Sequence, residues 1–124
     1  MGANGSNSTG ILKTEAGRRW KTIEVLPNGV KVIQFKTPTP GKMPEESHSP
    51  NSVYAMMEKN GKGLKSIAIY GSDCKKIAEI HTADHHGSGP HYHKWSNGRP
   101  TGDAIPIGKS PKYQKLLIET LNLL

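Results

Sequence analysis

Short apolar segments separated by turn signals constrain the fold of this chain more than any other feature of its sequence. Pro27-Asn28-Gly29 and Asn60-Gly61-Lys62-Gly63 are turn sequences, because Asn and Gly tolerate positive φ angles. Between such turns lie segments rich in β-branched and aromatic residues, which favour strands. The pattern predicts an antiparallel β-meander of four to five strands. The candidate strands are residues 19–26, 30–36, 52–58, 64–70 and 75–82.

The C-terminal end of the chain predicts a single helix. Ser110 suits the N-cap position and Pro111 the first helical position. Apolar residues then recur at helical spacing, which predicts a helix packed on the sheet and an α+β fold. These residues are Tyr113, Leu116, Leu117, Leu121 and Leu124. A length of 124 residues fits one domain, residues 13–124, after a Gly-, Asn- and Ser-rich linker at residues 1–12.

The charge of the chain predicts a polyanionic partner. Its 17 Lys and Arg residues outnumber 10 Asp and Glu residues, giving a formal net charge of +7. Nucleic acid is one such partner, and a membrane surface or an acidic protein would fit the charge equally well. RNA is the expected partner because of the histidines described next. A single cysteine, Cys74, excludes an intrachain disulfide. No apolar run reaches the roughly 18 residues of a membrane span, so none is expected. His48 stands alone in a Pro- and Ser-rich loop at residues 37–51 and is expected at the surface.

Histidines concentrate in one segment. Five of the six lie between positions 81 and 93, namely His81, His85, His86, His91 and His93. His91 and His93 are two residues apart, so on an extended segment both side chains share one face. The Gly-Ser-Gly-Pro sequence at residues 87–90 permits a turn that would bring His85 toward them. The spacing therefore predicts that His85, His91 and His93 converge on one solvent-open pocket.

Clustered histidines suit the cleavage of RNA by its own 2′-hydroxyl. That reaction needs a base for the hydroxyl proton and an acid for the 5′ leaving oxygen, and imidazole serves both near neutral pH. We expect His85, His91 and His93 to fill these roles. Asp84 would hold one of them in a single tautomer.

Neighbouring residues are the expected substrate-binding groups. Lys94 and Arg99 are the nearest cations for the charged transition state. His81 is a further candidate in the same segment. Trp95 could stack on a base, although a place in the core is the alternative for this residue. The leading hypothesis is thus a metal-independent endoribonuclease that needs no cofactor.

Two alternatives remain open. His91 and His93, completed by His85, could bind zinc or another divalent metal, which would make the protein a metal-dependent nuclease of DNA or RNA. Alternatively, the histidines form a polar surface, and the chain is a non-catalytic nucleic-acid-binding or structural module.

Asp84-His85 followed by Pro90-His91-Tyr92-His93, after an Ile-rich strand, resembles C-terminal toxin domains of bacterial polymorphic toxin systems. The resemblance covers about residues 64–95, and many such domains are ribonucleases. It implies secretion or delivery as part of a larger protein, action in the cytoplasm of a target cell, and a cognate immunity protein as partner. The positions that match are Asp84, His85, His91 and His93.

Overall fold

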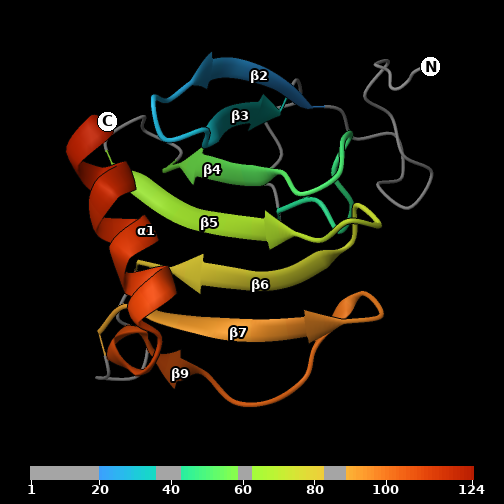
Figure 1. Ribbon diagram of the computed structural model, residues 1–124, viewed down its shortest axis with the longest axis vertical. Coiled ribbons are helices and arrows are strands. Elements are labelled where there is room, and N and C mark those ends of the chain that lie inside the picture. Colours follow the sequence, from blue (N-terminus) through green and yellow to red (C-terminus); the bar gives the residue numbers. More distant parts are fainter. Residues whose placement is uncertain (1–19, 36–42, 59–62, 83–88) are drawn as a thin grey trace.

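A mixed β-sheet is the framework of the protein (Figure 1). The computed structural model describes residues 20–35, 43–58, 63–82 and 89–124. Within these ranges the strand order is β2-β3-β4-β5-β6-β7-β8, and β9 also pairs with β7. The elements are β2 (Trp20–Val25), β3 (Lys31–Phe35), β4 (Val53–Met57), β5 (Leu64–Tyr70), β6 (Lys76–His81), β7 (His91–Ser96), β8 (Arg99–Pro100), β9 (Ile105–Pro106), the 3-10 helix η2 (Ile107–Lys109) and the helix α1 (Pro111–Leu123).

The α+β class predicted from the sequence is confirmed, but the sheet has more strands than the four to five expected. The five predicted strands form as β2 to β6, and β7 adds a sixth at residues 91–96. The remaining strands, β8 and β9, have two residues each, too few for an apolar alternation to reveal them. The antiparallel meander was wrong at one step, because β3 and β4 pair in parallel.

One face of the sheet, here called the helix face, packs against α1. Its core includes Val32, Ile67 and Ile80 from three strands, and Leu117 from the helix. Tyr92 of β7 meets Tyr113 of α1 edge-on, with ring centroids 5.0 Å apart. In Figure 1 the helix crosses the strands at one end of the sheet.

The helix begins as predicted. Ser110 is the N-cap, and its hydroxyl accepts a hydrogen bond from the Tyr113 backbone N–H at 3.2 Å. The predicted apolar stripe is only partly buried, because Leu117 is 4% exposed whereas Leu121 is 47% exposed. Thr120 is buried instead, and its hydroxyl accepts a hydrogen bond from the Asn28 side chain.

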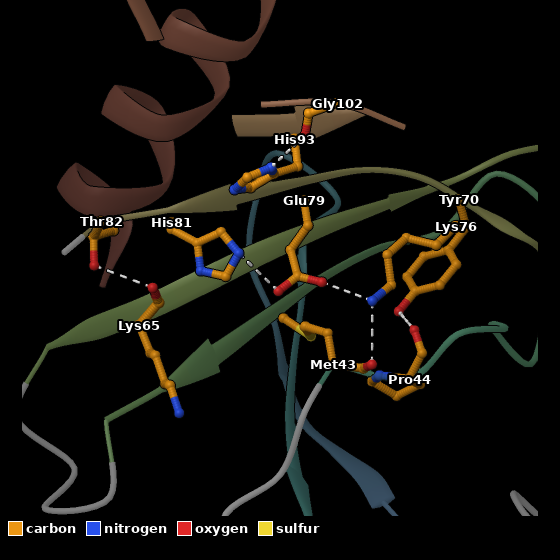
Figure 2. A network of polar contacts seen from close by, with 10 residues as sticks. All are labelled: Met43, Pro44, Lys65, Tyr70, Lys76, Glu79, His81, Thr82, His93 and Gly102. Atoms are coloured by element: carbon orange, nitrogen blue, oxygen red, sulfur yellow. Dashed lines mark hydrogen bonds and ion pairs between the residues drawn. The ribbon is translucent and has the colours of Figure 1, made fainter. Parts of the chain in front are cut away.

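The other face of the sheet, here called the open face, carries a second, aromatic core beside polar residues. Trp20, Tyr54 and Tyr70 are buried there. The segment from Met43 covers them, and the Tyr70 hydroxyl donates to the Pro44 carbonyl (Figure 2). The expectation that His48 lies at the surface was wrong. Its ring is partly buried and stacks on Trp20, with centroids 4.3 Å apart.

The predicted linker, residues 1–12, lies outside the described residues, as does most of the turn at residues 60–63. In the part of the chain that the structure describes, no helix is long and apolar enough to cross a membrane.

Candidate functional site

Three imidazoles gather on the open face, at the antiparallel pair of β6 and β7. The register places His81 opposite His91 and Glu79 opposite His93. Paired residues and residues two apart share a face, so these four side chains lie together. The His81 and His91 rings stack, with centroids 5.4 Å apart. His93 stands nearly perpendicular to both, 5.8 Å from His81 and 5.4 Å from His91. We call these three rings the imidazole cluster.

The carboxylate of Glu79 joins the cluster to a buried lysine. Its Oε2 lies 3.1 Å from Nε2 of His81, and its Oε1 lies 2.6 Å from Nζ of Lys76 (Figure 2). Burial alone would raise the pKa of Glu79. The hydrogen bond from His81 and the charge of Lys76 outweigh it, so the pKa of Glu79 lies below its ordinary value. Glu79 is therefore a carboxylate that orients His81.

Lys76 has two further contacts besides Glu79. Its Nζ donates to the Met43 carbonyl at 3.2 Å and lies 3.9 Å from the centre of the Trp95 ring. A β-bulge brings it to Glu79: Ile69 pairs with Ala78 but Tyr70 pairs with Lys76, which leaves one extra residue in β6. Without this bulge, residues 76 and 79 would point to opposite faces of the strand.

Hydrogen-bond partners assign the tautomers of the three rings. Nδ1 of His91 lies 3.2 Å from the Gly89 carbonyl, and Nδ1 of His93 lies 3.4 Å from the Gly102 carbonyl. A carbonyl only accepts, so Nδ1 carries the proton in both rings. His81 instead directs Nε2 at a carboxylate, so its proton is on Nε2. When neutral, His81 has its lone pair on Nδ1 and His93 has its lone pair on Nε2.

The rings differ in their access to solvent. The His81 side chain is 29% exposed and His93 is partly exposed, whereas His91 is only 4% exposed. His81 and His93 are therefore the more accessible rings, and His91 beside them is buried. Ser66 pairs with His81 from β5 and is 1% exposed. Its hydroxyl has no hydrogen-bond partner within the described ranges.

Only part of the predicted catalytic set comes together in the described residues. His91 and His93 come together as expected, but Asp84 and His85 lie outside the described residues, as does His86. His81, predicted only as a substrate-binding residue, completes the cluster.

Sequence reasoning missed Glu79 and Lys76. Glu79 and His81 have the same two-residue spacing on a predicted strand as His91 and His93, so that signal was present. No signal in the sequence marks the bulge that brings in Lys76.

The other three predicted substrate-binding residues do not join the cluster. Lys94 alternates with His93 along β7, so it is on the helix face, where it is exposed. Arg99 pairs with Ser96 and shares that face. Trp95 is partly buried and packs over Lys76, so one side of its ring is already occupied.

Over the described residues, no group of three or more His, Cys, Asp or Glu side chains is arranged to hold a metal ion. The predicted alternative of His85, His91 and His93 includes one residue outside those ranges.

Comparisons of the chain with protein-family models, with curated proteins and with solved structures found no match. The resemblance to toxin domains therefore stays a prediction. A fold alone does not define a function. The functional proposal for this protein therefore rests on the chemistry of the imidazole cluster.

Proposed function

We propose that this protein is a metal-independent endoribonuclease in which His81 is the general base and His93 is the general acid. One observation carries the proposal: two solvent-accessible imidazoles lie side by side on an open sheet face, and a buried carboxylate orients one of them. The net charge of +7 supports a polyanionic substrate.

In this proposal His81 is the base, and its contact with Glu79 supports that role. Nδ1 of neutral His81 accepts the proton of the RNA 2′-hydroxyl, whose oxygen attacks the adjacent phosphorus. The resulting imidazolium is stabilised by the Glu79 carboxylate at 3.1 Å. His93, protonated at both nitrogens, donates its Nε2 proton to the departing 5′ oxygen. The products are a 2′,3′-cyclic phosphate and a 5′-hydroxyl.

Positive charge at the phosphate comes from the cluster itself in this proposal. Lys94 and Arg99 lie on the other face, and Lys76 is buried against Glu79. The imidazolium of His93, and that formed on His81, therefore face the phosphate as its charge builds up. The remaining lysines act at longer range by attracting RNA.

The setting implied by the resemblance belongs to the same proposal. The domain would be delivered as part of a larger protein and act in the cytoplasm of a target cell. An immunity protein would block the open face around the imidazole cluster.

Cleavage of total RNA in excess EDTA tests this function. We expect cleavage to continue and to leave 2′,3′-cyclic phosphate ends. His81→Ala and His93→Ala should each lower the rate by about 10²-fold or more. Ser96→Ala is the matched control, because Ser96 is exposed on the helix face of the same strand, β7.

Other outcomes identify the alternatives. Activity lost in EDTA and restored by added metal would favour a metal-dependent nuclease. RNA binding that weakens with salt, without any cleavage, would favour a non-catalytic module. Full activity in His93→Ala would contradict the assigned roles.

A further inference from the structure

We propose that Lys76 is a positioning residue for His81: it holds one oxygen of Glu79 and so fixes the other oxygen on the imidazole. Its catalytic consequence rests on the proposed ribonuclease function. Two consecutive contacts join the three residues: Lys76 Nζ lies 2.6 Å from Glu79 Oε1, and Glu79 Oε2 lies 3.1 Å from His81 Nε2 (Figure 2).

Lys76 is buried where it can contact Glu79 but not a substrate. Its side chain is 2% exposed. The Met43 carbonyl accepts one of its protons, and the Trp95 ring covers the ammonium at 3.9 Å, which is a cation–π contact. A phosphate cannot reach an ammonium enclosed in this way. Glu79 is the acidic side chain with which Lys76 forms its ion pair.

The β-bulge gives the contact a structural cause. An extra residue in β6 is what turns Lys76 to the face of Glu79 and His81. Its neighbour Ile77 is left 45% exposed, an unfavourable place for an apolar side chain. The local conformation thus exposes an isoleucine while it buries a lysine beside the carboxylate.

The contact between Lys76 and Glu79 limits how the carboxylate can rotate against His81. A carboxylate accepts hydrogen bonds at both oxygens, and a buried one that meets only a single imidazole can rotate about its last side-chain bond. With Lys76 fixed on Oε1, rotation would break the shorter of the two contacts. Oε2 therefore stays on Nε2 of His81, and the lone pair of Nδ1 stays directed away from Glu79.

Two variants separate positioning from simple stabilisation. Lys76→Met leaves the Glu79 charge buried with one partner fewer, so it should lose stability as well as activity. The double variant Lys76→Met/Glu79→Gln has no charge at either position, and such charge-free replacements often recover stability. We expect Lys76→Met, which keeps Glu79, to have a kcat about 10²-fold lower under conditions where it is folded. The double variant should unfold near the wild-type denaturant midpoint without regaining kcat, so that the loss of activity does not follow the loss of stability.

Substrate binding is the second measurement. Because Lys76 does not reach the phosphate, KM and the salt dependence of RNA binding in the double variant, whose net charge is unchanged, should match those of the wild type. In Lys76→Met they should match those of a variant that loses one distant lysine. Lys112→Met removes a lysine charge from the exposed start of α1 and is the control for net charge. If the double variant regained the wild-type kcat, Lys76 would contribute only to stability, and the proposal would be overturned. A raised KM with a smaller salt slope would overturn it as well, by showing that Lys76 contacts substrate.

A third measurement does not depend on catalysis. In NMR spectra of the wild type, the Nε2 proton of His81 should be protected from exchange by its bond to Glu79, and Lys76→Met should remove this protection. Protection that persists in Lys76→Met would overturn the positioning role. Protection lost in a protein that cleaves no RNA would support the role of Lys76 and refute the ribonuclease function.

Discussion

Glu79 links the stability of the fold to the state of the site. It is 7% exposed, and its pKa lies below the ordinary value of 4.5 because Lys76 and His81 stabilise the carboxylate against the cost of burial. A lowered pKa in the folded state means that the unfolded chain binds this proton more readily. The stabilising contribution is therefore complete above the unfolded pKa and is lost as the pH falls through the folded pKa.

We predict that acid destabilises the wild type more than the charge-free double variant Lys76→Met/Glu79→Gln. Only the wild type has a carboxylate at position 79 that must be protonated. Denaturant unfolding at pH 7 and at several values below pH 4.5 measures the difference. Parallel losses of unfolding free energy in the two proteins would show that Glu79 is not the group responsible.

Residue positions were predictable where strict alternation holds. His91 and His93 were placed on one face from their spacing alone, and the same rule applies to Glu79 and His81. Lys76 was not predictable, because its side depends on a bulge defined by the partner strand β5. Asp84 and His85 were predicted site residues in the segment that follows β6, which lies outside the described residues, whereas the carboxylate of the described site, Glu79, lies within β6.

Among the elements, α1 was the best predicted, because its start depends on local chemistry. Ser110 and Pro111 act at the first turn without help from distant residues. Strand ranges were also close, because alternating apolar residues mark a half-buried strand. The parallel pairing of β3 with β4 was not predictable, because residues 36–52, which connect them, have no periodicity that specifies where the chain returns.

We predict that Ser110→Ala lowers the free energy of unfolding by about 1 kcal/mol, because the Tyr113 backbone N–H loses its acceptor. Denaturant unfolding provides the measurement. Ser110→Asp keeps an acceptor at the cap and serves as the matched variant, expected to stay near the wild type. An alanine variant as stable as the wild type would mean that the cap contributes nothing.

At the scale of the whole molecule, the two faces of the sheet differ in what they carry. The helix face packs against α1 at one end of the sheet, while the open face bears the imidazole cluster beside the aromatic core. Alternation within β6 and β7 supplies both faces at once: Ile80 and Tyr92 pack toward the helix, and His81 and His93 face the other way. The formal net charge of +7 would favour binding of the polyanionic substrate that we propose.

An NMR titration with an RNA oligonucleotide that carries 2′-O-methyl groups, and so has no free 2′-hydroxyl to attack the phosphate, tests the shared reaction centre most directly. We predict that the ring signals of His81 and His93 shift together and saturate at one concentration, while α1 signals stay in place. The complex should weaken as salt is added. Shifts confined to α1 or to the helix face, with the two histidine rings unaffected, would contradict a phosphate site on the open face.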